Sequence, residues 1–458
     1  MTRAPRTPSA VSAAVGPRRP WAACRLWDRL HDLGMTWVLL ALCALFSVLT
    51  WREQQPTGAA AARGVADDIR TAGPPPRVLV AVRDHPEDAA YADALAALLR
   101  ERGATVVGVV RGEPRVIRRA LLAEVEAGRR LDVVAGSAVT AGWSLLADVA
   151  GEFPTLGDPR VVRPRPYSWP DFLKADNLLN IANQIAVIAI LAVGMTLVIV
   201  TGGIDLSAGS LIALSSVVTA LIVRDGVGGV EADPVGMTLA GVGGVAVGAL
   251  AGALSGGLIV AFGIPPFIAT LAMMLVAGGA ASILAEGQSV YQLPDAFTWL
   301  GRHADLGLPN AVLLVLVLYA AAQVVMTRMT LGRWLFAVGG NREAARLSGV
   351  PVAATLLAAY VLSGALAGLG GVVMASQLKS GSPNFGQMYE LYVIAAVVVG
   401  GTSLAGGEGS MVGTLVGALI IAVIQNGMNL VGIESYTQRV VLGTVILAAV
   451  LLDRLRRR

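Results

Sequence analysis

Charged residues are scarce in this sequence. Asp, Glu, Lys and Arg together make up 14% of the 458 residues, whereas about 25% is usual for a soluble domain. Apolar residues account for 55%, and the mean hydropathy is +0.67. This composition excludes an ordinary soluble domain and favours a polytopic α-helical membrane protein. The formal net charge of +4 comes from arginines that flank the predicted membrane spans, so it does not indicate binding to nucleic acid.

Lysine, histidine and cysteine are also rare. The two lysines, Lys174 and Lys379, do not lie in a G-x-x-x-x-G-K-[ST] motif, which excludes a P-loop for ATP. None of the three histidines belongs to an H-E-x-x-H motif, and the two cysteines, Cys24 and Cys43, indicate neither a disulfide framework nor a metal site. We therefore predict that the chain is not an enzyme and has no metal or cofactor of its own. If ATP drives the protein, ATP and its Mg²⁺ bind to a partner subunit.

Ten apolar runs are predicted membrane spans, because about 20 mostly apolar residues cross a hydrocarbon core roughly 30 Å thick. Arginines gather in the tail 1–35, in the loop 328–351 and in the tail 454–458, which share one side of the membrane if the number of spans is even. We place this side, with both termini, in the cytoplasm. The first run could also be a cleaved signal peptide, but we favour an anchor. The predicted spans are 36–51, 181–201, 206–223, 236–262, 266–285, 310–327, 352–375, 389–403, 411–431 and 436–452.

The segment between the first and second spans does not have the composition of a membrane helix. A linker rich in alanine and proline, 52–75, leads to an α/β insert at 76–170. Within the insert, short apolar runs alternate with helical patterns, which predicts a small parallel sheet on the extracytoplasmic side. The predicted strands are 77–84, 104–110 and 131–138, and the predicted helices are 86–103, 113–130 and 140–153.

Asp84 and His85 follow the first predicted strand of the insert. Open parallel sheets bind ligands at this edge, so these two residues are candidates for a ligand site, although a solvated loop is the simpler interpretation. The turn has no G-x-G-x-x-G sequence, which argues against a dinucleotide site.

A helix break is predicted inside the apolar stretch "VIVTGGIDLSAGS", residues 198–210. Paired glycines free backbone groups there, and an acid follows them. Asp205 is either a cap for the next helix, which we expect to begin near residue 206, or a group on a transport pathway. A similar glycine-rich stretch at 397–415 indicates either an internal repeat or a chance likeness. The residues of the predicted break are Gly202, Gly203, Asp205, Ser207 and Gly209.

Five amide side chains interrupt the apolar spans. Gln425 and Asn429 are four residues apart, which places them on one face of a helix. Amides at such positions either line a pore, where they bind sugar hydroxyls, or join helices to one another. The pore candidates are Asn183, Gln184, Gln425, Asn426 and Asn429.

The loop between the sixth and seventh predicted spans contains "NREAARLSG", which reads as a short helix. Asn341 is the expected cap, Glu343 and Arg346 pair at i,i+3, and Gly349 ends the helix. A short charged helix beside a membrane bundle is typical of a docking element. The residues of this predicted docking site are Gly340, Asn341, Arg342, Glu343, Arg346 and Gly349.

Four further motifs fall in order along the chain: "VGMTLVIVTGGIDLSAGSLIAL", "TLGRWLFAVGGNREAARLSGVPV", "YELYVIAAVVVGGTSLAGGEGSMVGTLVGALI" and "IQNGMNL". Together they resemble the permease subunits of ribose-type and xylose-type ABC monosaccharide importers. The resemblance covers about residues 172–453, in a permease domain drawn at 171–453, and it implies a homodimer in the bacterial inner membrane. It also implies that a cytoplasmic ATPase docks at 341–349, that an extracytoplasmic binding protein delivers a sugar, and that alternating access moves the sugar.

Two features depart from that family. Tyr392 stands where the family usually has aspartate, and the α/β insert is an addition that loosely resembles one lobe of a sugar-binding protein. We expect the insert either to assist docking of the binding protein or to be a vestigial lobe. Two other functions remain open: a secondary transporter that couples an ion through Asp205, and a membrane-tethered sensor whose insert binds the ligand. The sequence does not identify the sugar.

Overall fold

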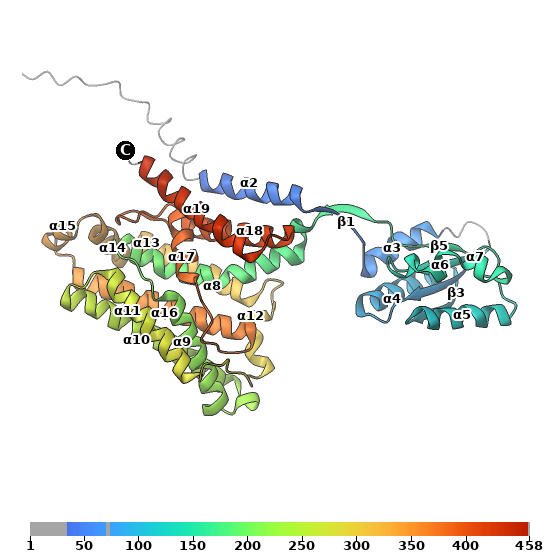
Figure 1. Ribbon diagram of the computed structural model, residues 1–458, viewed down its shortest axis with the longest axis horizontal. Helices are drawn as coiled ribbons and strands as arrows, with labels where there is room; N and C mark the ends of the chain where they lie inside the picture. Colours follow the sequence, from blue (N-terminus) through green and yellow to red (C-terminus); the bar gives the residue numbers. More distant parts are fainter. Residues whose placement is uncertain (1–33, 70–73, 457–458) are drawn as a thin grey trace, which may run out of the picture. The chain divides into compact units, whose positions relative to one another are not determined.

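The computed structural model describes residues 34–69 and 74–456, which divide into two compact units (Figure 1). The helical unit contains the chain up to Leu49 and from Phe172 onward, and the α/β unit is Thr50–Asp171. Nearly all of the predicted N-terminal tail, with Cys24, and the last two residues of the basic C-terminal tail lie outside the described residues.

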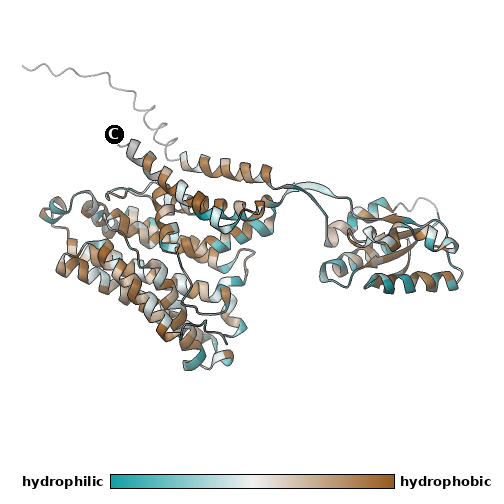
Figure 2. Ribbon diagram, in the orientation of Figure 1, coloured by the Kyte–Doolittle hydropathy of each residue, from teal (hydrophilic) through white to brown (hydrophobic). Residues whose placement is uncertain are grey.

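Seven described helices of the helical unit are long and apolar enough to cross a membrane, and α2 and α17 are shorter apolar helices. Figure 2 shows their largely hydrophobic composition in brown. They confirm the predicted membrane class, whereas the full count of ten spans stays a prediction. Helix α19 covers the tenth predicted span. The helices are α2 (Gly34–Leu49), α8 (Ala175–Val200), α9 (Ala208–Leu221), α10 (Pro234–Phe262), α11 (Pro266–Leu284), α12 (Trp299–Arg302), α13 (Asn310–Arg328), α14 (Thr330–Gly340), α15 (Arg342–Leu347), α16 (Val352–Leu378), α17 (Tyr389–Val399), α18 (Met411–Val431) and α19 (Ser435–Arg456).

Helix α8 lies at the centre of the helical unit, and every residue from Ile185 to Val200 is buried. Around it, α10 and α16 approach each other closely through glycine. A Cβ on Gly248 or Gly252 would overlap the backbone of α16, and a Cβ on Gly364 would overlap that of α10. Small residues are what allow two membrane helices to approach this closely.

The α/β unit contains a parallel sheet whose strand order is β3-β2-β4-β5. Alternate residues of β2 point to opposite faces of the sheet, as the pleat requires. Val80 packs in the core beneath α3 and α4, whereas Leu79 and Ala81 pack in the core beneath α5. The elements are α3 (Gly58–Asp68), β2 (Arg77–Val82), α4 (Pro86–Glu101), β3 (Thr105–Arg111), α5 (Pro114–Glu126), β4 (Val133–Gly136) and β5 (Arg160–Val162).

The segment expected to be a linker, 52–75, contains secondary structure. Strand β1 (Trp51–Gln54) pairs antiparallel with β6 (Tyr167–Pro170), which brings the two ends of the unit together. Helix α3 follows and buries Ala62 and Val65 in the core of the unit. The alanine-rich composition of α3 concealed this role, because small apolar residues pack against a sheet without a strong hydrophobic pattern.

The helix expected at 140–153 is not continuous. The chain forms three short pieces, η1 (Thr140–Gly142), α6 (Ser144–Ala147) and α7 (Val149–Glu152). At Asp148 the backbone leaves the helical region, and its carboxylate accepts a hydrogen bond from the Gly151 amide at the start of α7. Strand β5, with only three residues, was not predicted.

Candidate functional site: a helix break, a docking helix and two cavities

The helix break lies between α8 and α9, at the position predicted from the glycines. Gly202 has a positive φ of 76°, which favours glycine. Asp205 is buried, and its Oδ1 accepts hydrogen bonds from the Ser207 amide (3.0 Å) and hydroxyl (2.6 Å). Its Oδ2 accepts one from the Ser363 hydroxyl of α16 (2.8 Å). The carboxylate therefore holds the turn and ties it to α16.

This geometry corrects the predicted cap. Helix α9 begins at Ala208 with Ser207 in the N-cap position, two residues beyond Asp205. Asp205 thus stabilises the turn before the helix and does not cap its first residues. The glycine at 203 is required for a different reason, because a Cβ there would overlap the hydroxyl of the fully buried Tyr360.

The short helix α15 has the local structure predicted from its sequence. The Asn341 side chain accepts hydrogen bonds from the amides of Glu343 and Ala344, both at 3.0 Å. Glu343 and Arg346 form an ion pair at 2.6 Å, and both side chains are about two-thirds exposed. Gly349 follows the helix with a φ of 83°. The helix is therefore well formed, and its charged groups are exposed.

The loop that carries α15 rests directly on the helix break. The Arg342 guanidinium donates a hydrogen bond to the carbonyl of Thr201, at the end of α8 (3.4 Å). Gly339, at the end of α14, packs so closely that a Cβ there would overlap the Val200 carbonyl and the Gly407 amide. These two contacts join α14 and the start of α15 to the end of α8.

The two similar glycine-rich stretches also meet at this point. The Gly407 amide donates a hydrogen bond to the Val200 carbonyl (2.9 Å), and a Cβ on Gly406 would lie against the backbone of Gly202. The two stretches therefore contact each other at the C-terminal end of α8.

Three of the five pore candidates line one cavity of about 250 Å³, which we call the amide cavity. Two tyrosines of α17 also line it, with ring centroids 6.2 Å apart. One of them is Tyr392, the residue that departs from the family pattern, so the chain presents a phenol here in place of a carboxylate. The polar residues of the amide cavity are Gln184, Tyr389, Tyr392, Gln425, Asn429, Ser435 and Gln438.

The remaining two pore candidates join helices. Asn426 exchanges two hydrogen bonds with Asn177, at 2.9 and 3.1 Å. Asn183 donates to the carbonyl of Gly301 (3.2 Å), and its own carbonyl accepts from the Gln377 amide group (2.9 Å). Both amides thus act as the polar contacts that hold membrane helices together.

A second cavity, of about 440 Å³, was not predicted from the sequence. We call it the Glu390 cavity, because the carboxylate of Glu390 is the one acidic group among its lining residues. It lies between α9, α11 and the segment that leads into α17. The sequence did contain a sign of this site, because Glu390 is an acidic residue at the start of an apolar span. An ionisable residue at such a position is a candidate for function.

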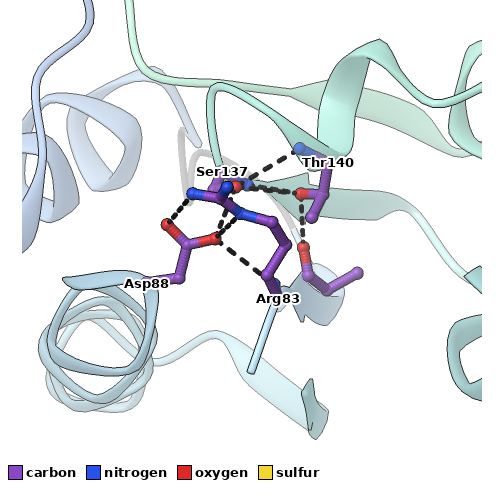
Figure 3. A network of polar contacts seen from close by, with 5 residues as sticks. Arg83, Asp88, Ser137 and Thr140 are labelled. Atoms are coloured by element: carbon purple, nitrogen blue, oxygen red, sulfur yellow. Dashed lines mark hydrogen bonds and ion pairs between the residues drawn. The ribbon is translucent and has the colours of Figure 1, made fainter. Parts of the chain in front are cut away.

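The carboxyl edge of the α/β sheet holds a buried network (Figure 3). Asp88 of α4 accepts hydrogen bonds from the Arg83 side chain (2.9 Å) and from the Ser137 hydroxyl (3.1 Å). Thr140 closes the network, since its hydroxyl accepts from the Ser137 amide (2.8 Å). Burial raises the pKa of Asp88, but the hydrogen bonds from Arg83 and Ser137 outweigh burial and hold that pKa below its usual value.

The sequence analysis named Asp84 and His85 at this edge, and both are exposed outside the network. The neighbouring residues Arg83 and Ser137 occupy the position between β2 and β4 where an open sheet binds ligands. Their hydrogen bonds satisfy Asp88, so this edge is filled by the unit's own side chains. A ligand role for Asp84 and His85 stays a prediction.

The long apolar helices and the break between α8 and α9 define a multi-pass membrane protein. The chain belongs to the family of branched-chain amino acid transport system permease components, which it matches over residues 177–450. The match begins after the α/β unit, which therefore lies outside it.

Curated relatives share the same region. The chain is 44% identical to the ribose import permease protein RbsC of Escherichia coli (strain K12) over 288 residues, which are 62% of this chain and 87% of that protein. It is 44% identical to RbsC of Bacillus subtilis (strain 168) over 287 residues, with the same coverage. It is 38% identical to the D-allose transport system permease protein AlsC of Escherichia coli (strain K12) over 284 residues, 62% of this chain and 85% of that protein. No solved structure matches the chain. The predicted resemblance to sugar-importer permeases is confirmed.

Proposed function

We propose that this chain is the membrane-spanning permease of an ATP-driven importer in a bacterial inner membrane and that its cargo is a monosaccharide. The relatives named for ribose and D-allose support the cargo class. The single observation that carries the mechanism is that the proposed docking loop contacts the helix break. Gly339 packs against the end of α8, and Arg342 donates a hydrogen bond to it. A partner that moves this loop would shift the end of α8 and so change access to the interior.

The proposed partners follow from this arrangement. A cytoplasmic ATPase docks on α15, whose Glu343 and Arg346 are exposed, and it holds the ATP and Mg²⁺. A binding protein delivers the sugar from the other side, and a second copy of the chain completes a homodimer. With the arginine-rich loop 328–351 in the cytoplasm, an even number of spans places both termini there as well.

Reconstitution into proteoliposomes tests this function. The chain is combined with its ATPase and binding protein, and uptake of labelled ribose, allose and arabinose is measured with ATP and with a non-hydrolysable analogue. We expect uptake of at least one sugar only with hydrolysable ATP. Uptake that follows a proton or sodium gradient without the ATPase would contradict the proposal and support an ion-coupled transporter.

We further propose that the α/β unit lies outside the cytoplasm and assists docking of the binding protein. Its separate cores support a self-contained role, and its parallel sheet has four strands, too few for a two-lobed sugar cleft. The register Gln54↔Tyr167 brings its ends together. Residues 55–166 can therefore be replaced by a short Gly/Ser linker without straining the helical unit.

The deletion separates the possible roles of this unit. We expect the deleted chain still to bind the ATPase. Its affinity for the binding protein should fall about tenfold, which corresponds to about 1.4 kcal/mol of binding free energy. Unchanged affinity and uptake would indicate a vestigial lobe. Sugar binding by the full chain that disappears on deletion, in a protein that transports nothing, would instead support a sensor.

A further inference from the structure

The Glu390 cavity is lined by residues of several membrane helices and of the segment before α17. Its volume of about 440 Å³ falls within the range of about 300–1,000 Å³ that small-molecule sites occupy. Its walls come from α9, α11, the segment 383–388 and the first turn of α17. Three separate parts of the chain therefore meet around it.

The backbone of the segment before α17 is held in an unusual conformation that shapes this cavity. Gly386 and Met388 both have positive φ, 72° and 68°, and for a methionine this is uncommon. Gly386 also packs against α9, since a Cβ there would overlap the Gly209 carbonyl. The tight turn fixes Gln387 and Glu390 on the wall of the cavity.

Glu390 lies over the first turn of α9. A Cβ on Gly209 would overlap the Glu390 carboxylate, so only glycine fits beneath it. The free amides at a helix N-terminus favour a negative charge. Among the described residues, no other side chain donates a hydrogen bond to this carboxylate, and its recorded partner is its own backbone amide. The carboxylate therefore keeps acceptor capacity for a ligand.

The rest of the lining suits a polyhydroxylated molecule. Ser210 offers a hydroxyl, Gln387 an amide and Phe385 an aromatic ring, while α11 contributes Gly278 and other small or apolar residues. A carboxylate accepts hydrogen bonds from two neighbouring hydroxyls, and an amide both donates and accepts. A few polar groups on an otherwise apolar wall are the usual composition of a small-molecule site.

We propose that the Glu390 cavity is the site at which the permease itself contacts its cargo, with Glu390 accepting hydrogen bonds from sugar hydroxyls during passage. This inference rests on the proposed function as a monosaccharide importer. The amide cavity is the weaker candidate, because it is smaller, about 250 Å³, and contains no charged group.

The first test compares Glu390→Gln with Glu231→Gln, a matched change at an exposed glutamate on a short 3₁₀ helix of the same unit. Sugar uptake and ATP hydrolysis are measured in proteoliposomes with both partner proteins. A hydrogen bond to a charged group corresponds to about a ten- to hundredfold effect. We expect Glu390→Gln to lower the sugar moved per ATP by at least about tenfold while stimulated hydrolysis continues, and Glu231→Gln to behave as wild type.

A second measurement keeps the proposal testable if Glu390→Gln fails to fold. In a chain with Cys24→Ser and Cys43→Ala, a single Gln387→Cys reports on the Glu390 cavity, and a single Gln438→Cys reports on the amide cavity. Labelling by a small maleimide is followed during turnover with and without sugar. We expect the transported sugar to slow labelling at 387 and to leave labelling at 438 unchanged.

Three outcomes would overturn the inference. Normal uptake by Glu390→Gln together with unprotected labelling at 387 would remove the site while the proposed function stands. An effect of Glu390→Gln on proton or sodium dependence, with the sugar yield intact, would indicate a cation site. If the wild-type chain with its partners moves no sugar, the proposed function itself fails, and this inference fails with it.

Discussion

The two units of this protein solve the problem of a buried carboxylate in different ways. In the α/β unit, Asp88 is paired with a partly exposed arginine, Arg83. In the helical unit, the recorded donors to the buried Asp205 are a backbone amide and the hydroxyls of Ser207 and Ser363. An arginine near water is available at the edge of a sheet, whereas inside a membrane bundle small hydroxyl groups satisfy the charge without adding a second one.

The units also differ in how they pack. The α/β unit has two apolar cores, composed mainly of alanine, valine and leucine, on the two faces of a sheet. In the helical unit, backbones approach one another at glycine, as at Gly248 with Gly364 and at Gly339 with Val200. Backbone contacts have no side chain that can adjust, so this unit should tolerate added volume poorly.

The largest expected effect tests this sensitivity. Gly339→Val places two methyl groups against the Val200 carbonyl and the Gly407 amide. Overpacking of this kind costs about 1–3 kcal/mol and would separate the docking loop from the helix break. We expect ATP-dependent uptake to be lost. The control is Gly257→Val in α10, where nothing lies within 4 Å of the added Cβ, and equal loss in both variants would contradict the coupling role.

The next effect concerns Asp205, whose carboxylate accepts hydrogen bonds from two serine hydroxyls. Asp205→Ala leaves the Ser207 and Ser363 hydroxyls without their acceptor, and an unsatisfied buried group costs about 1–3 kcal/mol. Asp205→Asn keeps one acceptor oxygen, so its thermal unfolding midpoint in detergent should fall less. Similar stability of both variants would contradict the role in the turn. Loss of uptake in both with normal stability would indicate direct contact with cargo or an ion.

The stabilisation that Asp88 provides through its pairing with Arg83 should depend on pH. Because the pKa of Asp88 is held below its usual value of 3.8, its stabilisation is complete above pH 3.8 and is lost as the pH falls through the lowered pKa. At pH 7, Asp88→Asn should destabilise the α/β unit by about 1.5–3 kcal/mol, and the difference from wild type should vanish in acid. Hydrogen exchange at the β2 and β4 amides in the full chain measures this.

A matched surface pair provides the control for the pH experiment. Asp93 forms an ion pair with Arg111 and is more than two-thirds exposed. Exposed pairs contribute less than about 1 kcal/mol, so Asp93→Asn should change exchange little at any pH. An equal effect of Asp88→Asn and Asp93→Asn would show that burial of Asp88 has no energetic consequence.

The smallest effect on stability is expected at the docking helix. Glu343 and Arg346 are about two-thirds exposed, so replacing both by alanine should lower stability by less than about 1 kcal/mol. We expect the same double variant to weaken co-purification of the ATPase and to lower uptake. If the complex assembles and transports normally, α15 is not the docking site.

The local features of the site were predictable from neighbouring residues. The break at Gly202, the cap at Asn341 and the ion pair from Glu343 to Arg346 all form within a few positions of the chain, and all are present. The exact role of Asp205 in the turn was not predictable, because Ser207 takes the N-cap position of α9 and one hydrogen bond to Asp205 comes from Ser363, 158 positions away. No pattern in a single sequence reveals such a contact.

The sequence by itself determined the membrane class, the helix break, the short capped helix α15 and the family, because composition and short-range capping act within one segment. Only the tertiary structure decided which amides share a cavity and which join helices, and that Glu390 faces a space of its own. It also showed that the docking loop touches the break. These relations depend on how distant helices pack, and glycine lets their backbones meet without leaving a side-chain pattern to read.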